Sequence, residues 1–540
     1  MTLSQLLKQA DFHRRSSHWL DALHGYQHVQ QQQPDNSVVA HNIALCHLAL
    51  DQVDDAIVQS QRALQLNPNL WQSALVLAKA LAKRNDKPAA LALLQQLHAQ
   101  LPQTAEIRIE LAKLTLHVLG DAVQARQLVE PLLNHEHHGR DAQITRLVTQ
   151  LYDRDPDITA QQVNQGFLDY GVQQSDVALQ TQAKVNAALA VPIRTTSHHR
   201  RLRVGLISPQ FFASPVYFFT IGAWQYLGMA VDLIVFNRGS KTDWATKAFQ
   251  RIAKDWLDVG VLTAEQLALA IARQSIDVLV DLGGWMDPVA LQALATKPAK
   301  KMYKWVGGQS VTTGLRSFDG FLSDSYQTPA GSDALYSEPL IRLKSGYVTY
   351  TAPPYMPLPQ PPKSDAPLVF GVIANPAKVS RAFLADLAVR HLRWQSRHHQ
   401  PITLRLIDYR YQHEAVCQRV RAALTSATVE FVRPASHRDY LSAVAQLDAT
   451  LDTMPYSGGL TTIEALTLGV PTYTRMGTLF CERHTVAHCH YAGLLLADCC
   501  LDRLDGLDLS GRTGQTLLQS NSPRVDHVTL ADELLGIFSP

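Results

Sequence analysis

The chain has 540 residues, and 49 lysines and arginines nearly balance 47 aspartates and glutamates to leave a formal net charge of +2. This balance argues against a nucleic-acid coat or a polybasic membrane binder, and 46% hydrophobic residues exclude global disorder. At roughly 150 residues per domain, the length predicts three or four domains. No apolar run approaches the ~20 residues of a membrane span, the N-terminus does not read as a signal peptide, and six cysteines form no disulfide framework. We therefore expect a cytoplasmic protein that neither enters membranes nor binds nucleic acid.

Residues 1–139 carry an internal repeat of 34 residues. Three sets of residues share this period: Pro34, Pro68 and Pro102; Ala10, Ala44, Ala78 and Ala112; and Ala22, Ala56 and Ala90. The period is that of the tetratricopeptide repeat, in which each unit is a pair of antiparallel helices. The fourth unit slips, because Ala125 follows Ala90 by one residue more than the period. Stacked repeats present a concave groove, so we expect this region to bind a protein or peptide, with a stabilising or dimerising module as the alternative.

The rest of the chain divides into four predicted segments. An irregular helical connector is expected over 140–199, an amino-terminal lobe over 200–350, a proline-rich linker over 351–367 and a carboxy-terminal lobe over 368–540. Both lobes alternate helical stretches with short apolar runs, at 202–208, 231–236, 276–282, 301–306, 339–343, 368–374, 402–407, 429–432, 449–454 and 470–474. Such alternation is typical of parallel βαβ units. We predict an all-α repeat region followed by two Rossmann-like α/β lobes, with ligand at the carboxyl ends of the strands.

The sharpest motif is TMPYSGGLTTIEALTLGVP, residues 453–471. Gly458 and Gly459 let backbone approach a ligand closely. Thr461 and Thr462 are predicted to open a helix, whose free N–H groups and positive dipole end suit a pyrophosphate. Glu464 is expected in the first helical turn, where a carboxylate can accept hydrogen bonds from ribose hydroxyls. A structural helix cap is the alternative interpretation.

A second motif, FGVIANPAKVSRAFL, covers residues 370–384. Lys378 follows a predicted strand and precedes a predicted helix. A lysine in such a loop can reach a phosphate as a point charge. A solvated surface lysine is the alternative.

The two motifs stand in a series that resembles glycosyltransferase family 41, the family of the O-GlcNAc transferases, and most closely its bacterial members. The resemblance covers nearly the whole chain and keeps the order of the family's motifs. The matching segments are RVGLIS-x-x-F (203–211), VLVDLGGW (278–285), KWVGGQSVTTG (304–314), LSDSYQTPAG…LYSEPLIRL (322–343), FGVIANPAK (370–378), PYSGGLTTIEALTLGVP (455–471) and GTLFCERH (477–484).

This resemblance implies a GT-B catalytic region that transfers a sugar from a UDP-sugar to a protein side chain, with inversion and without a metal or other cofactor. It also implies a protein acceptor recruited through the repeat groove, and a homodimer is a further expectation. GlcNAc and serine or threonine are the favoured sugar and acceptor. The positions that match donor-binding residues of the family are Asn375, Lys378, Tyr440, Gly458, Gly459, Thr461, Thr462, Glu464, Thr312, Thr313 and Gly314.

The acceptor side departs from the family. Ser214 stands where the family has a histidine in its His-Pro element, Phe218 replaces a second histidine, and Trp285 replaces the histidine that bacterial members carry after glycine. Serine is a poor general base at neutral pH. Lys378 and Ser214 are still the predicted catalytic positions. Transfer of glucose to asparagine, and a weak repeat scaffold that only binds nucleotide or partner protein, are the alternatives.

Two groups of residues invite a metal interpretation, which the resemblance does not favour. Asp153-Arg154-Asp155 has the DxD form that GT-A enzymes use for a metal, but it lies in the helical region. A cluster of residue types that bind zinc falls in a segment that we expect to be a packed helix beside the nucleotide: Cys481, His484, His488, Cys489 and His490. We therefore expect no metal at either place.

Overall fold

The computed structural model describes residues 2–190, 201–360, 367–397, 401–507 and 525–539. It divides into two compact units, Met1–Thr149 and Gln150–Pro540, which we describe separately. The predicted connector 140–199 and linker 351–367 lie partly outside the described residues. Within the described ranges, no helix is both long and apolar enough to cross a membrane.

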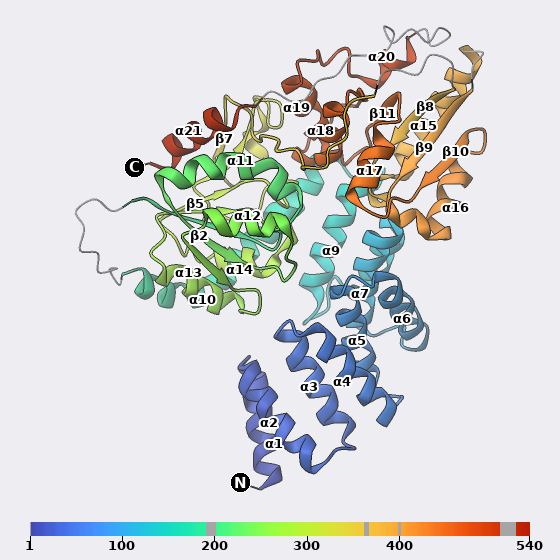
Figure 1. Ribbon diagram of the computed structural model, residues 1–540. Coiled ribbons are helices and arrows are strands. Elements are labelled where there is room, and N and C mark those ends of the chain that lie inside the picture. Colours follow the sequence, from blue (N-terminus) through green and yellow to red (C-terminus); the bar gives the residue numbers. More distant parts are fainter. Residues whose placement is uncertain (1, 191–200, 361–366, 398–400, 508–524, 540) are drawn as a thin grey trace. The chain divides into compact units, whose positions relative to one another are not determined.

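The first unit is built from helix pairs (Figure 1). Its helices are α1 (Leu3–Arg15), α2 (Trp19–Gln32), α3 (Ser37–Ala49), α4 (Val53–Leu66), α5 (Trp71–Lys83), α6 (Lys87–Gln100), α7 (Ala105–Leu114) and α8 (Ala122–Val129), and α9 (Gly139–Tyr152) crosses into the second unit. The first helices of the pairs begin at Leu3, Ser37, Trp71 and Ala105, each 34 residues after the last. The repeating alanines are buried, which lets neighbouring helices approach closely. The predicted repeat is therefore confirmed.

The slip in the fourth repeat has a local structural cause. A π-helical turn, Thr115–Leu119, follows α7 directly. A π-turn accommodates one extra residue in a helix, so α8 begins at Ala122, one residue later than the period places it. Ala125 nevertheless reaches the buried position of its counterparts, with 0% exposure. The insertion is absorbed without loss of the packing alanine.

The second unit contains two parallel sheets, which confirms the two α/β lobes. The first sheet has the order β3-β2-β1-β4-β5-β6-β7. Its strands are β1 (Arg203–Ser208), β2 (Asp232–Asn237), β3 (Asp255–Asp258), β4 (Val278–Asp281), β5 (Lys301–Lys304), β6 (Gly320–Ser323) and β7 (Leu340–Arg342). β3 and β6 were not predicted. β3 is a partly exposed edge strand without an apolar run, whereas β6 is a buried strand of four residues. The helices of this lobe are α11 (Pro215–Ala230), α12 (Trp244–Ile252), α13 (Ala264–Arg273) and α14 (Pro288–Leu294), and α10 (Ala160–Leu189) precedes it.

The second sheet has the order β10-β9-β8-β11-β12. Its strands are β8 (Leu368–Val372), β9 (Ile402–Ile407), β10 (Thr428–Val432), β11 (Ala449–Leu451) and β12 (Thr472–Tyr473). The accompanying helices are α15 (Arg381–Arg397), α16 (Glu414–Ala423), α17 (His437–Val444), α18 (Leu460–Thr467), α19 (His484–Tyr491) and α20 (Leu501–Asp505). The last described helix of the chain is α21 (His527–Phe538). The strand order reverses between β8 and β11. In open α/β sheets this switch point is where a crevice forms and ligands bind.

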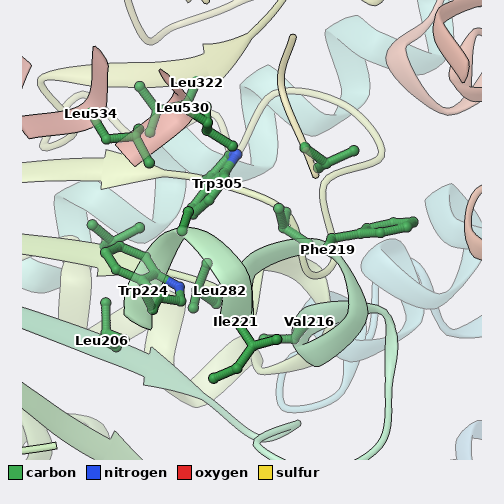
Figure 2. Packing of buried hydrophobic residues seen from close by; sticks show 14 of the residues in the cluster. Leu206, Val216, Phe219, Ile221, Trp224, Leu282, Trp305, Leu322, Leu530 and Leu534 are labelled. Carbon is green, nitrogen blue, oxygen red and sulfur yellow. The ribbon is translucent and has the colours of Figure 1, made fainter. Parts of the chain in front are cut away.

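The last helix of the chain packs in the core of the first sheet. α21 contributes Leu530 and Leu534 to the cluster that surrounds Trp224 of α11 and Trp305 (Figure 2). The Trp224 and Trp305 rings meet edge to face, with centroids 5.4 Å apart. α21 therefore returns to the amino-terminal lobe, although its residues belong to the range predicted for the carboxy-terminal lobe.

We expect Leu534→Ala to lower the free energy of unfolding of the second unit by about 3 kcal/mol, because it leaves a cavity between α21 and α11. The measurement is the urea midpoint followed by tryptophan fluorescence. Leu495→Ala is the matched control, since Leu495 is 71% exposed, and it should change stability by less than about 0.5 kcal/mol. Equal midpoints for the two variants would contradict the packing role of α21.

Candidate functional site

Lys378 lies at the switch point of the second sheet. A single 3₁₀ turn, Pro376–Lys378, follows β8, and Asn375 caps it by accepting a hydrogen bond from the Ala377 N–H (2.9 Å). Lys378 Nζ donates to the carbonyl oxygen of Ser457 (2.8 Å) and lies 4.2 Å from the centre of the Tyr456 ring. Burial lowers the pKa of Lys378 to about 8, although the Asp452 carboxylate opposes this shift. The structure thus places a partly desolvated cation beside the glycine motif.

The loop between β11 and α18 is held by the buried side chain of Asp452. This carboxylate accepts hydrogen bonds from the Gly458 N–H (2.7 Å) and the Thr474 hydroxyl (2.6 Å). Burial raises the pKa of Asp452 to about 6, against these hydrogen bonds and the charge of Lys378. A Cβ on Gly458 would lie 2.4 Å from Thr462 Oγ1. Glycine is therefore required there by close packing within the loop.

Gly459 precedes α18 and borders open space. A Cβ added to it would have no described atom within 4 Å. The N–H groups of Thr462 and Ile463 turn back to the Gly459 carbonyl oxygen (3.1 and 3.3 Å), whereas within the described residues those of Leu460 and Thr461 contact no acceptor. Unpaired N–H groups at a helix start favour an anion.

The two threonines of the motif have different surroundings. Both lie at the start of α18, as expected. Thr462 is buried, and its hydroxyl is hydrogen-bonded to the hydroxyl of Thr485 (2.9 Å), which in turn donates to the Gly458 carbonyl. Thr461 is partly exposed at the same helix end. The side chain of Thr462 therefore fixes the loop, and only Thr461 presents a hydroxyl near the surface.

The expectation that Glu464 lies in the first helical turn is wrong. α18 begins at Leu460, so Glu464 is its fifth residue, and the first turn holds no acidic side chain. Glu464 is buried, and its Oε1 lies 2.8 Å from Nε2 of His437. Burial raises the pKa of Glu464, and the histidine opposes the shift. Its carboxylate is therefore held by a side chain of the neighbouring helix α17.

His437 is a site residue that we did not predict from the sequence. It begins α17, and its Nδ1 lies 3.0 Å from the Tyr355 hydroxyl, which completes a chain from Tyr355 through His437 to Glu464. Its ring stacks on Tyr440 (centroids 5.9 Å apart) and packs against Phe218 (5.6 Å). The sequence did contain a signal that could have identified His437. Residues three apart on a helix share a face, and His437 precedes the predicted site residue Tyr440 by three.

Among the described residues, Ser214 makes no hydrogen bond with His437, Tyr440 or Glu464, and it is connected to them only because it precedes helix α11. It is the buried residue that precedes α11, and its hydroxyl donates to the Gln210 carbonyl oxygen (2.9 Å). The adjacent Ala213 N–H contacts the Asp243 carboxylate (3.0 Å). Phe218, one turn along α11, is the residue of this element that contacts His437. The catalytic role of Ser214 stays a prediction.

Thr312, Thr313 and Gly314 face the interior of the amino-terminal lobe. Both threonines are buried, and both hydroxyls donate to the Glu338 carboxylate. Gly314 has a φ of +73°, and a Cβ there would lie 2.5 Å from the Phe167 carbonyl oxygen of α10. Among the described residues, the two threonine hydroxyls contact Glu338, whereas the Lys378 ammonium contacts the Ser457 carbonyl. Their role in donor binding stays a prediction.

Ser310, two residues earlier in the same loop, does contact the carboxy-terminal lobe. Its hydroxyl is hydrogen-bonded to that of Tyr456 (2.8 Å), and its carbonyl accepts from the Cys481 N–H (2.9 Å). Tyr456 also stacks on Tyr152, with centroids 5.0 Å apart. The ring under Lys378 is thus contacted by the amino-terminal lobe and by the end of α9.

The Asp-Arg-Asp sequence after α9 connects separate elements. Asp153 pairs with Arg381 of α15 (3.1 Å), Arg154 forms an ion pair with Glu482, and Asp155 accepts from Gln150 (2.7 Å). The two carboxylates therefore have different partners.

Cys481, His484 and His488 are all buried, and burial lowers the pKa of His488 to about 3.

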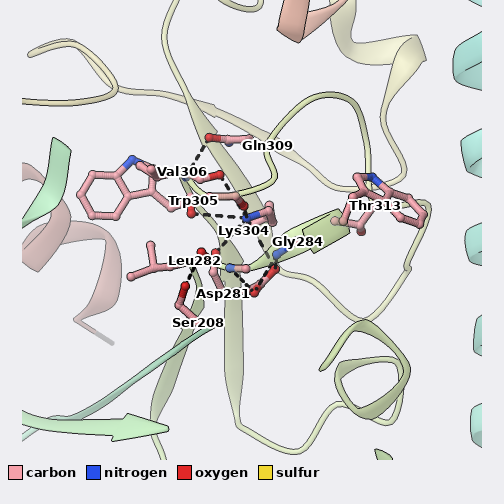
Figure 3. Close-up of polar contacts among 12 residues, drawn as sticks. Ser208, Asp281, Leu282, Gly284, Lys304, Trp305, Val306, Gln309 and Thr313 are labelled. Atoms are coloured by element: carbon pink, nitrogen blue, oxygen red, sulfur yellow. Dashed lines mark hydrogen bonds and ion pairs between the residues drawn. The ribbon is translucent and has the colours of Figure 1, made fainter. Parts of the chain in front are cut away.

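A buried lysine holds the amino-lobe loop that carries Ser310. Lys304, at the end of β5, is 0% exposed. Its ammonium donates to the carbonyl oxygens of Asp281 (3.0 Å) and Gly307 (2.7 Å) and lies 3.5 Å from the Asp281 carboxylate (Figure 3). It also donates to the carbonyl of Val306, whose φ of +51° is strained for a β-branched residue. Burial lowers the pKa of Lys304, and Asp281 opposes the shift.

Trp285 connects the loop that follows β4 to helix α10. Its indole N–H donates to the Thr312 carbonyl oxygen (3.0 Å), and its ring packs against Phe167 (centroids 4.9 Å apart). Trp285 therefore acts as a packing residue at this edge of the sheet. The same loop is also connected to β1, because the Ser208 hydroxyl at the end of that strand donates to the Leu282 carbonyl (2.8 Å).

Comparisons with known proteins agree with this architecture. The chain is 27% identical over 315 residues to the Petunia hybrida protein named "Probable UDP-N-acetylglucosamine--peptide N-acetylglucosaminyltransferase SPINDLY", a match that covers 55% of this chain and 32% of the relative. It is 24% identical over 160 residues to the protein SEC of Arabidopsis thaliana, which carries the same enzyme name (29% and 16% covered). The chain therefore spans about a third or less of the length of these relatives. No family model matches.

A solved structure extends the likeness to the whole chain. A mutant of the Thermobaculum terrenum O-GlcNAc transferase has the same fold, with a TM-score of 0.63 and 24% identity over 99% of this chain and 96% of the other. The chain therefore has the fold of an O-GlcNAc transferase. The relatives confirm the resemblance expected from the motifs, and the solved structure confirms the expected repeat region followed by two GT-B-like lobes.

We expect Lys304→Met to lower the free energy of unfolding of the second unit by about 3 kcal/mol, because it removes one partner of a buried ion pair. The measurement is chemical unfolding followed by circular dichroism. Lys300→Met is the matched control, since Lys300 is exposed where it pairs with Asp277, and it should cost at most about 1 kcal/mol. A Lys304 variant as stable as the control would show that the carbonyl contacts are dispensable.

Proposed function

We propose that the chain is an inverting, metal-independent protein glycosyltransferase that moves a sugar, GlcNAc in the first instance, from a UDP-sugar to serine or threonine of a protein acceptor. The observation that carries this proposal is the position of Lys378, 2.8 Å from Ser457 at the switch point and beside the start of α18. The curated names of the relatives, which denote UDP-N-acetylglucosamine–peptide transferases, support the same reaction class.

The proposed chemistry follows from where charge develops. When the bond between the sugar and UDP breaks, negative charge grows on the diphosphate. The Lys378 ammonium and the unpaired N–H groups at the start of α18 would stabilise that charge in a partly desolvated site, where such interactions are strong. A cation supplied by the chain takes the place that a metal ion has in other transferases.

The remaining donor-site assignments rest on neighbouring geometry. Gly459 leaves room for a phosphate beside Thr461. The ribose and base would lie toward Glu464 and Tyr440, which His437 connects. Asn375 would act by shaping the turn that presents Lys378. The protein acceptor would be recruited by the groove of the repeat region.

We expect Lys378→Ala to reduce kcat by at least about 100-fold, the loss typical when one charge-stabilising donor is removed. Lys247→Ala, at an exposed position of α12, is the control and should retain full turnover. The measurement is UDP release from UDP-GlcNAc in the presence of acceptor. Unchanged turnover in Lys378→Ala would contradict the assignment of the donor site.

The pH dependence of the wild-type enzyme provides a second test of Lys378. Because its pKa is lowered to about 8, the ammonium form prevails below this pH and is lost as pH rises through it. We therefore expect kcat/KM for the donor to fall above about pH 8, since this parameter reports the free enzyme. Lys378→Arg should remove that decline, because arginine stays charged. A profile that falls equally in both proteins would assign the decline to another group.

Intact mass of a co-expressed acceptor tests the sugar and the reaction class. With a panel of UDP-GlcNAc, UDP-glucose and GDP-fucose, we expect a gain of one N-acetylhexosamine on serine or threonine, unchanged when a chelator is present. A hexose on asparagine would instead support N-glucosyl transfer. Binding of UDP without transfer would support the scaffold alternative.

A further inference from the structure

Two histidines and an aspartate lie close together around the short loop between α1 and α2, at the start of the first unit. The side chains of His13, His18 and Asp21 each offer one ligand atom, and these atoms all lie within 4.8 Å of one another. They form the one such group that the described part of the chain contains among histidine, cysteine, aspartate and glutamate side chains. It lies in the first unit, outside the proposed donor site in the second.

The backbone of this turn is held by its own hydrogen bonds. His13 is in the last turn of α1, and His18 immediately precedes α2. The His18 N–H donates to the His13 carbonyl oxygen (2.8 Å), and Ser17 between them adopts a φ of +59°. Asp21 follows His18 by three residues, so the two share one side of the helix start. The three side chains therefore project from a closed turn with little backbone freedom.

The donor set suits a transition-metal ion. Imidazole nitrogen and carboxylate oxygen are ligands of Zn²⁺, and three protein ligands with one open position form a recognised type of zinc site. Bonds of about 2.0–2.1 Å place tetrahedral ligand atoms about 3.3 Å apart, so binding requires a modest inward rotation of the side chains. His18 and Asp21 are exposed, and such rotation is open to them.

A second observation concerns His13 itself. Its Nδ1 is buried and has no hydrogen-bond partner among the described residues. A buried polar atom without a partner costs free energy, and coordination through this nitrogen would remove the cost.

The charged groups around the turn do not block a cation. The neighbouring Arg14 donates to the Tyr26 hydroxyl (3.1 Å), which donates to Asp11 (2.5 Å). The guanidinium is thus directed to a tyrosine and carboxylate of its own. The turn lies at the carbonyl end of α1, where the helix dipole favours positive charge, and at the N–H end of α2, where it opposes it, so the two dipoles largely cancel there.

We propose that His13, His18 and Asp21 bind one Zn²⁺ ion, which connects α1 to α2 and stabilises the first helix pair. The site is independent of the proposed transferase reaction.

The test is isothermal titration of the full-length protein with Zn²⁺ after chelator treatment and dialysis, combined with melting temperatures with and without the ion. We expect one equivalent to bind the wild-type protein and to raise its melting temperature. Loss of even an outer partner of a metal ligand weakens binding about 10–100-fold, so His18→Gln and Asp21→Asn should each weaken it at least about tenfold and abolish the thermal shift.

Two control variants separate this site from other histidines. His24→Gln removes an exposed histidine of α2 outside the group, and a joint His135→Gln and His137→Gln variant removes a pair of nearby rings elsewhere. Both should bind Zn²⁺ like the wild type. The proposal is overturned if the wild type binds no Zn²⁺ at micromolar concentration, or if His18→Gln and Asp21→Asn bind it unchanged. Circular dichroism without metal establishes that the variants are folded.

Discussion

The contact between the Lys378 ammonium and the Ser457 carbonyl brings the two halves of the candidate site together. Lys378 follows the first strand of the second sheet, and Ser457 follows the fourth, so the contact forms across the point where the strand order reverses. Desolvation makes the cation costly, and the carbonyl, the Tyr456 ring and the nearby Asp452 offset part of that cost. A diphosphate placed at this point would compensate the charge more fully than the neutral carbonyl and ring do.

The amino-terminal lobe reaches this site through a chain of buried polar contacts. Lys304 gathers the carbonyls at the ends of β4 and β5, and the loop that follows presents Ser310 to Tyr456. An ammonium surrounded by carbonyl oxygens acts here much as a bound cation would, and it sustains the strained backbone of Val306. The charge is retained in the core because removing it would leave several carbonyl groups unpaired.

Much of the fold could be predicted from periodicity alone. The 34-residue period reappears in the helix starts at Leu3, Ser37, Trp71 and Ala105, and ten apolar runs correspond to strands. β3 was missed because an exposed edge strand needs no apolar run. The packing of α21 on α11 was also missed, since an amphipathic helix does not specify which of two hydrophobic cores it joins.

The candidate site was predictable only where a local motif determines local structure. Gly458, Gly459 and the helix that begins beside Thr461 follow from chain-local turn and capping preferences, and Lys378 follows from its place after a strand. The roles of Glu464, Thr312 and Thr313 depended on partners distant in sequence. His437 holds Glu464, and Glu338 holds both threonines.

Sequence by itself therefore determined the repeat, the two α/β lobes and the glycine-lysine pair at the switch point, because periodicity and turn chemistry act over short stretches of chain. Only the tertiary structure decided which polar side chains are free to meet a ligand. Each buried hydroxyl, carboxylate or ammonium must find a partner, and that partner comes from whichever element packs against it.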